Sequence, residues 1–189
     1  MKVFDDVYEK NRWGGGESRS GPGAGSIAVT QLAPLLKELV NRLGVQSVLD
    51  VGCGDGFWMP DLPGYIGIDV STKTIEASRQ RHPGREYLID SGDPYPKCEL
   101  AIVRCVMQHL PYDEGLALLD RVRDAGVTWL LATTYTEGEL NVDVGYSGSH
   151  GYWIDLTAGP FHLGQPVESL VDHGASTEHG GVLGLWKLR

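Results

Sequence analysis

The most specific chemical pattern in the sequence is a run of alternating glycines that follows a short apolar stretch. The run is Asp50-Val51-Gly52-Cys53-Gly54-Asp55-Gly56. Glycine at every second position allows a tight turn and lets a ligand approach the main chain, because no Cβ stands in the way. Asp69 follows thirteen residues after Gly56, at the end of a second apolar stretch. A carboxylate there can accept hydrogen bonds from both hydroxyls of a ribose, so the pattern predicts a site for an adenosine-containing cofactor.

The spacing of the glycines separates two kinds of cofactor. Dinucleotide sites favour GxGxxG, in which a helix begins at a pyrophosphate. Here the spacing is DxGxGxG, and Asp55 within the turn disfavours a pyrophosphate but not a sulfonium that carries a free amino group. The chain resembles class I S-adenosylmethionine-dependent methyltransferases from about residue 30 to residue 135. The resemblance implies that S-adenosyl-L-methionine is the cofactor and that the protein is a methyltransferase.

The same resemblance implies which residues contact the cofactor. The residues that would line its methionine and ribose side are Asp50, Gly52, Cys53, Gly54 and Gly56. Asp69 would hold the ribose hydroxyls, and Val70 would lie against the adenine. Asp90, after the third apolar stretch, would lie near the adenine amino group, with Asp93 as the alternative. Asp90 could equally be a turn acid that hydrogen-bonds its own backbone.

The segment after the fourth apolar stretch holds the candidate catalytic residues. Open α/β sheets bind ligands beyond the carboxyl ends of their strands, so Gln108 and His109 are expected at the transferred methyl group or the acceptor. His109 could act as a general base because the histidine pKa lies near neutrality, or it could pack the start of a helix. Arg104 could bind an acidic acceptor or pair with a structural acid.

Residues 1–26 form a glycine-rich opening that contains Trp13, Ser18 and Ser20. We expect either a mobile tail or a lid that folds over bound cofactor or substrate. Three segments also resemble a group of small bacterial and phage methyltransferases: Tyr8–Ser26, Asp93–Leu100 and Tyr152–Phe161. That resemblance implies that Trp13 and Glu17–Ser20 cap the cofactor, with the hydroxyls near its methionine end. Asp155 departs from the asparagine expected in this group.

Hydrophobic periodicity predicts an α/β protein. Helices are expected at residues 27–43, 72–81 and 113–125, and strands at 47–52, 65–70, 86–90, 99–106, 128–135 and 181–188. Ser71 is the expected N-cap of the second helix, and Gly44 should end the first. This alternation indicates a doubly wound, parallel sheet with helices on both faces. The fold class expected is Rossmann-like and mostly parallel, with an antiparallel last strand. Residues 27–189 are then one methyltransferase domain.

The charge and composition of the sequence limit the kinds of partner that we expect. The net charge of −9 disfavours nucleic acid, because basic side chains supply most of the non-specific affinity for phosphates. No apolar run is long enough to span a membrane, no secretory signal is present, and three cysteines without CxxC spacing indicate a reducing cytoplasm. The spacing of His150, His162, His173 and His179 matches no metal site, so no metal is expected.

The acceptor is expected to be a small molecule, such as a sugar or another secondary metabolite. An aromatic segment that includes Tyr146, Tyr152, Trp153 and Phe161 could wall its pocket or only cover the sheet. One alternative is a methyltransferase that acts on nucleic acid or protein, although the Asn/Asp-Pro-Pro-aromatic motif of adenine-N6 enzymes is missing. The other is a cofactor-binding protein without transfer activity.

Overall fold

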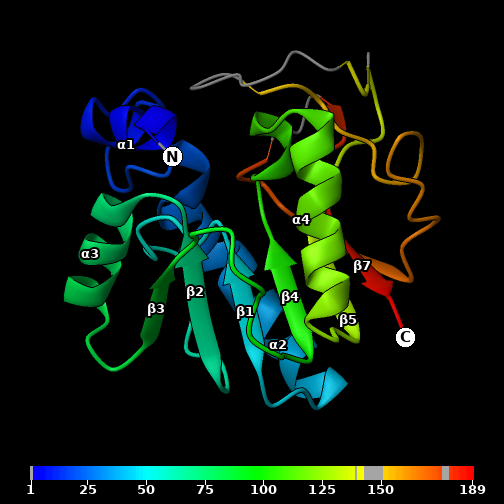
Figure 1. Cartoon of the computed structure of the whole chain (residues 1–189), viewed down its shortest axis with the longest axis horizontal. Helices are drawn as coiled ribbons and strands as arrows, with labels where there is room; N and C mark the ends of the chain where they lie inside the picture. The colour runs from blue at the N-terminus through cyan, green and yellow to red at the C-terminus, as the bar shows by residue number, and fades with distance from the viewer. Residues whose placement is uncertain (1, 139, 143–150, 176–178) are drawn as a thin grey trace.

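A mostly parallel β-sheet forms the centre of the computed structural model, which describes residues 2–138, 140–142, 151–175 and 179–189 (Figure 1). In the described residues the sheet has seven strands in the order β3-β2-β1-β4-β5-β7-β6. The strands are β1 Val48–Val51, β2 Tyr65–Asp69, β3 Glu86–Ile89, β4 Leu100–Val103, β5 Trp129–Thr134, β6 Glu168–Val171 and β7 Val182–Lys187. β7 runs antiparallel to both neighbours, β5 and β6. The predicted mostly parallel sheet with an antiparallel last strand is confirmed.

The two faces of the sheet are covered by different helices. Along β4, Leu100 and Ile102 belong to one buried cluster, and Ala101 and Val103 to the other, because successive strand residues point to opposite faces. The first cluster packs against α2 (Ala33–Leu43) and α3 (Thr72–Arg81). The second packs against α4 (Tyr112–Asp124), which crosses in front of β4 and β5 in Figure 1.

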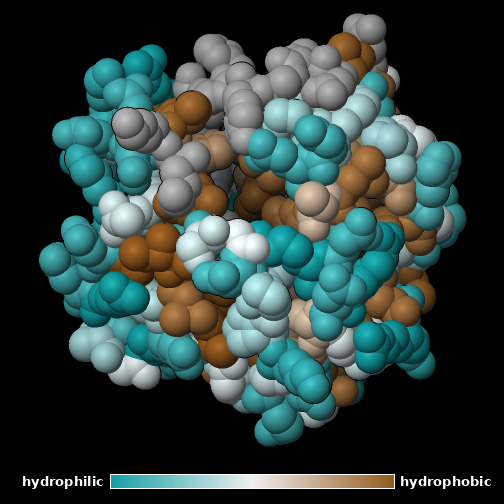
Figure 2. Space-filling model, in the orientation of Figure 1, coloured by the Kyte–Doolittle hydropathy of each residue, from teal (hydrophilic) through white to brown (hydrophobic). Residues whose placement is uncertain are grey.

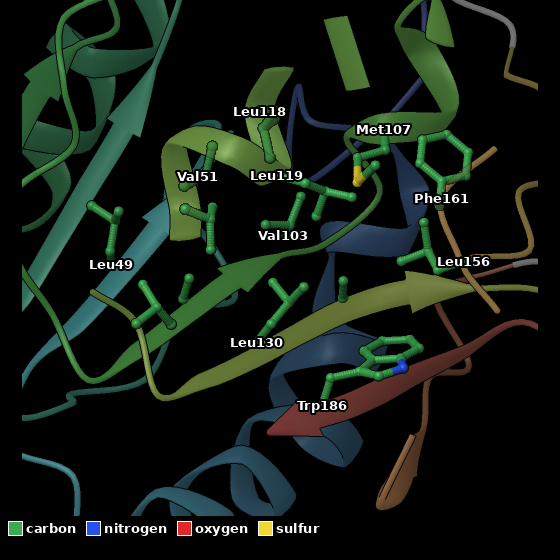
Figure 3. Close-up of a cluster of buried hydrophobic side chains, with 14 of the residues drawn as sticks. Leu49, Val51, Val103, Met107, Leu118, Leu119, Leu130, Leu156, Phe161 and Trp186 are labelled. Atoms are coloured by element: carbon green, nitrogen blue, oxygen red, sulfur yellow. The ribbon is translucent and has the colours of Figure 1, made fainter. Parts of the chain in front are cut away.

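Figure 3 shows the cluster on the α4 face. Leu118 and Leu119 of α4 lie over Val51 and Val103, two side chains near the carboxyl ends of β1 and β4. Phe161 and Leu156, from the segment after β5, close the same cluster on the side of β5 and β7. The aromatic segment therefore covers the sheet through these side chains, which is one of the two roles expected for it. Tyr146 and His150 lie outside the described residues.

Several helix ends lie where local sequence signals predicted them. Ser71 accepts a hydrogen bond from the backbone nitrogen of Thr74 at the start of α3, so the predicted N-cap is confirmed. Gly44 ends α2 in the left-handed conformation, with φ 69°. The predicted helix 27–43 contains a short π-helical stretch, Ala28–Leu32, before α2. Among the described residues no helix is long and apolar enough to cross a bilayer.

Two features of the fold were not predicted, the strand β6 and the helix α1. β6 is a four-residue edge strand in which Leu170 is the buried hydrophobic residue, too short to give a periodic pattern. A short helix, α1 (Lys2–Glu9), opens the chain and packs beside α3.

The N-terminal strap, residues 11–26, is fixed to the sheet by a buried ion pair. The guanidinium of Arg104 donates to Asp172 at 2.7 and 2.9 Å and to the carbonyl of Gly23 at 2.7 Å. The Asp172 side chain is fully buried. A Cβ on Gly174 would lie 2.2 Å from the Gly23 oxygen and 2.4 Å from Nη2 of Arg104, so the two glycine backbones touch. The strap is thus docked rather than free in this structure.

Gly174→Ala should destabilise the protein by about 1–3 kcal/mol, because the new methyl group must push the strap carbonyl or the guanidinium out of place. Urea unfolding measures the change. Gly84→Ala is the matched control, since a Cβ at Gly84 meets open space, and it should change the free energy of unfolding by less than about 0.5 kcal/mol. Equal effects of the two substitutions would contradict the tight contact.

Candidate active site

A cavity of about 370 Å³ opens at the carboxyl ends of β1, β2 and β4, which we call the carboxyl-edge cavity. In Figure 2 a hollow bordered by hydrophobic residues opens on the face in view. α1 and the strap contribute Phe4, Tyr8 and Trp13 to its lining. The strand ends contribute Val51, Gly52, Asp69, Val70, Asp90, Ser91, Gly92 and Tyr95, and the segment after β4 with α4 contributes Cys105, Val106, His109, Leu110, Glu114, Ala117, Leu118 and Arg121. Its position matches the general rule for ligand sites in open α/β sheets.

The glycine turn after β1 requires glycine for two reasons. Gly52, Gly54 and Gly56 all have positive φ angles, 72°, 59° and 64°, which side chains rarely adopt. In addition, a Cβ on Gly54 would lie 2.1 Å from Oγ of Ser20, and one on Gly52 would lie 2.3 Å from Val106. The glycines thus allow both a left-handed turn and close packing of the strap.

The amide groups of this turn are used inside the protein. The nitrogens of residues 52–56 all donate hydrogen bonds to protein acceptors. These acceptors are the Ile68 carbonyl for residues 52 and 53, and then Asp69, Ser20 and the Cys53 carbonyl for residues 54, 55 and 56. A pyrophosphate site needs amides that point at the ligand, usually at a helix N-terminus. This turn offers its amides to the protein instead, and irregular chain rather than a helix follows it.

Asp69 combines burial with unused acceptor capacity. Its two carboxylate oxygens accept hydrogen bonds from the backbone nitrogens of Gly54 and Ser71, both at 2.9 Å. An ionised carboxylate has about four acceptor positions, so about two remain, and Asp69 lines the cavity. Burial raises the pKa of Asp69 to about 6, although the two backbone hydrogen bonds and the Thr74 side chain oppose the rise. Asp69 can therefore accept from two further donors when it is ionised.

Asp90 lines the same cavity but has its acceptor positions filled. Arg121 donates to both oxygens at 2.7 and 3.1 Å, Tyr95 donates its hydroxyl at 3.0 Å, and the Gly92 nitrogen donates at 3.0 Å. Burial would raise the pKa of Asp90, but the Arg121 and Gly92 hydrogen bonds outweigh it and lower the pKa. The expected contact with an adenine amino group conflicts with this geometry. The Gly92 bond is the turn role expected as the alternative, whereas the Arg121 pair was not foreseen.

The strap serines bind Asp55 rather than the cavity. Ser18 and Ser20 donate their hydroxyls to Oδ1 of Asp55 at 2.8 and 3.3 Å, and the Arg19 nitrogen donates to Oδ2 at 3.1 Å. These hydroxyls were expected near the methionine end of a cofactor, but in the structure they anchor the strap to Asp55. Trp13 does line the cavity, with its ring centroid 5.4 Å from that of His109.

The three candidate catalytic residues have different surroundings. His109 lines the cavity, whereas Arg104 and Gln108 do not. Arg104 pairs with Asp172, which is the structural alternative considered for it. Gln108 is buried and donates to the Tyr135 hydroxyl at 3.3 Å. Of the three, His109 is therefore positioned to reach a ligand.

The remaining predicted turn residues support the cavity from behind. Asp50, Cys53, Gly54 and Gly56 are buried and do not line it. Asp50 accepts a hydrogen bond from the Tyr65 hydroxyl at 2.9 Å, and burial raises the pKa of Asp50 to about 7. Among the described residues, no group of three His, Cys, Asp or Glu side chains could hold a metal ion.

Sequence reasoning missed several cavity residues, among them Phe4, Tyr95, Cys105, Glu114 and Arg121. Cys105 is the second residue after the end of β4 and could have been included by its position in the chain. Phe4 and Arg121 come from helices whose orientation over the strand ends is set by tertiary packing, so local pattern gave no signal for them.

Comparisons with known proteins identify the fold. No family model and no curated protein sequence matches the chain. Magnesium protoporphyrin IX methyltransferase from Synechocystis PCC 6803, solved with bound SAM, superposes with a TM-score of 0.62 at 15% identity, covering 85% of this chain and 80% of that one. The N-terminal domain of EvdMO1, in the presence of SAH and D-fucose, gives 0.61 at 14% identity, covering 87% and 84%. The methyltransferase domain of a bacterial Hen1 gives 0.59 at 16% identity, covering 84% and 98%.

These similarities show that the chain has the fold of class I SAM-dependent methyltransferases. The expected Rossmann-like fold class is thereby confirmed.

Asp50 should make the stability of the ligand-free protein depend on pH. The pKa of Asp50 is higher in the folded protein than its ordinary value of 3.8. The contribution of Asp50 to the free energy of unfolding is therefore fully present below about pH 4 and is lost as pH rises through about 7. Asp50→Asn removes this loss, because the Tyr65 hydroxyl can still donate to the amide oxygen. As pH rises from 5 to 8, the free energy of unfolding of the variant should increase relative to that of the wild type by on the order of 2 kcal/mol.

Chemical denaturation at the two pH values measures that difference. Asp61→Asn is the control, since this exposed side chain pairs only at the surface with Arg85. A difference between Asp50→Asn and wild type that stays constant from pH 5 to pH 8 would contradict the raised pKa.

Proposed function

We propose that this protein is an S-adenosylmethionine-dependent methyltransferase that transfers a methyl group to a small-molecule acceptor. The observation that carries the proposal is Asp69, a buried carboxylate with about two acceptor positions left beside a cavity at the strand ends. Two free positions match the two hydroxyls of one ribose. The inward-turned amides of residues 52–56 further favour a sulfonium cofactor over a dinucleotide.

The cofactor would lie along the carboxyl-edge cavity, and bound S-adenosyl-L-methionine would supply a methyl group on a good leaving group. Asp69 holds the ribose, Val70 and Gly52 contact the adenosine, and Trp13 covers the reacting end. Asp50, Cys53, Gly54 and Gly56 shape the turn. Such a transfer depends mainly on holding donor and acceptor in line, so the rigid cavity walls are part of the catalysis.

The strap is part of this site in our proposal. Ser18 and Ser20 hold it to Asp55, and the strap in turn presents Trp13 to the cavity. Residues 1–26 therefore act as a docked cover over cofactor and substrate, and residues 27–189 form the methyltransferase domain. Gly174→Ala, which loosens the strap, should accordingly also weaken adenosylhomocysteine binding.

A small acceptor fits the surface and the cavity. The net charge is −9, and cationic side chains such as Arg42 and Arg123 pair with acids at 2.7 and 2.8 Å, which lowers the attraction for phosphate chains. Among structural neighbours, one is named for a porphyrin substrate and another was solved with D-fucose. We propose a sugar or another secondary metabolite as acceptor. The three free cysteines suit the cytoplasm, where we place the protein.

Asp69→Asn should weaken adenosylhomocysteine binding by about 5- to 150-fold, the equivalent of about 1–3 kcal/mol for a lost charged acceptor. Isothermal titration calorimetry measures the affinity. In the wild type the affinity should also fall as pH drops below about 6, because protonation of Asp69 removes acceptor capacity. The variant should lack this dependence between pH 5 and pH 7.

The control variant is Asp61→Asn, a substitution at an exposed acid outside the cavity. A nicotinamide dinucleotide should not bind the wild type. Tight binding of the dinucleotide and none of adenosylhomocysteine would overturn the proposed function.

His109 is the proposed general base for a hydroxyl acceptor, because it lines the cavity beside Trp13. His109→Gln should lower kcat by about 100-fold or more, the range for loss of a positioned base, and should leave the affinity for adenosylhomocysteine within about twofold. Steady-state assays with labelled cofactor, on an acceptor found by screening, give both values. An unchanged kcat would exclude His109 as the base.

A further inference from the structure

The segment after β3 forms the part of the carboxyl-edge cavity next to Asp69. The Asp90 nitrogen donates to the Asp69 carbonyl at 2.9 Å, so the two chain segments are adjacent. Ser91 and Gly92 follow and line the cavity together with Arg121 from α4. A base attached to a ribose held by Asp69 would extend past Val70 to these residues. This inference thus rests on the proposed function and concerns how the base is recognised.

The polar groups at this end differ in what they can still bind. A 6-amino group is a hydrogen-bond donor and needs an acceptor. Asp90 has four donors on its two oxygens, which fills an ionised carboxylate. Arg121 has donors only, and its guanidinium lies 3.8 Å from the centre of the Tyr95 ring. Neither of these charged groups can accept from an adenine.

Ser91 has the acceptor capacity that Asp90 lacks. Its hydroxyl hydrogen is donated to Oδ2 of Asp93, so the lone pairs of Oγ are left to accept. The residue is exposed and belongs to the cavity lining, so a ligand can reach it. Asp93 fixes the direction of the hydroxyl, because one hydrogen atom cannot be donated to both Asp93 and the ligand.

We propose that Ser91, oriented by Asp93, accepts the hydrogen bond from the 6-amino group of the adenine, and that Asp90 is a structural partner of Arg121. Ser91 is then the residue that distinguishes a 6-amino purine from a 6-oxo purine. A 6-oxo group brings an acceptor towards Ser91, whose hydrogen is already committed to Asp93. The site therefore prefers the adenine cofactor without a carboxylate contact to the base.

Calorimetry with two product cofactors tests the proposal. Adenosylhomocysteine and its 6-oxo analogue, S-inosylhomocysteine, are titrated into the wild type, Ser91→Ala and Asp90→Asn. The wild type should bind the 6-amino form about 3- to 10-fold more tightly, the usual range for one hydrogen bond. Ser91→Ala should reduce this ratio to about one by weakening the 6-amino form alone. Asp90→Asn should weaken both ligands alike and keep the ratio.

Ser169→Ala is the matched control, because Ser169 is an exposed serine of β6 outside the cavity, and it should change neither affinity. The proposal is overturned if Ser91→Ala keeps the wild-type ratio, if Asp90→Asn abolishes it, or if the wild type does not discriminate. A wild type that binds neither ligand overturns the proposed function itself, which is a distinguishable outcome.

Discussion

The two hydrogen bonds from the Gly54 and Ser71 nitrogens to the Asp69 carboxylate hold the site together. They tie the turn after β1 to the end of β2 and to the start of α3, three segments that must keep their places for any ligand to fit. A buried carboxylate is unfavourable unless hydrogen bonds compensate for the lost water. The two amides compensate only in part, as the raised pKa of Asp69 shows. A ligand that supplies two further donors would complete the compensation. The carboxylate that holds the three segments together would then also bind the ligand.

The strap depends on two further buried charged side chains, Asp55 and Arg104. Asp55 and Arg104 each join a distant part of the chain to the strap, through Ser18 in one case and Gly23 in the other. Removing one partner of a buried charged pair is costly because the other is left uncompensated. The strap, which adds Trp13 to the lining of the carboxyl-edge cavity, is therefore held by interactions outside the cavity.

The sequence predicted what local pattern can encode. The glycine turn, Asp69, the caps at Ser71 and Gly44 and the sheet with its reversed last strand all follow from short-range spacing or from the alternation of strands and helices. The partners of Arg104, Ser18 and Asp90 could not be predicted from short-range spacing. Arg104 and Asp172 are 68 residues apart, and nothing in either neighbourhood indicates the other. The residue types at these positions suggested contacts with a ligand. In the structure each of these side chains instead interacts with another part of the protein.

Four aspartates near the turn illustrate why partners decide. Asp50 is sealed behind the turn against Tyr65, and Asp55 is occupied by the strap. Asp90 lines the carboxyl-edge cavity, but hydrogen bonds from Arg121, Tyr95 and Gly92 occupy its acceptor positions. Asp69 faces the cavity with capacity to spare.

All four have the same side chain and lie near the carboxyl end of a strand, and the spacing after the glycine turn already favoured Asp69 as the ribose acid. Counting the donors on each carboxylate separates them, because a ligand can use only lone pairs that the protein has left free. By that count Asp69 is the acid of the four that can hold a ribose. In our proposal the base beyond it uses an acceptor other than Asp90, because four donors already fill that carboxylate.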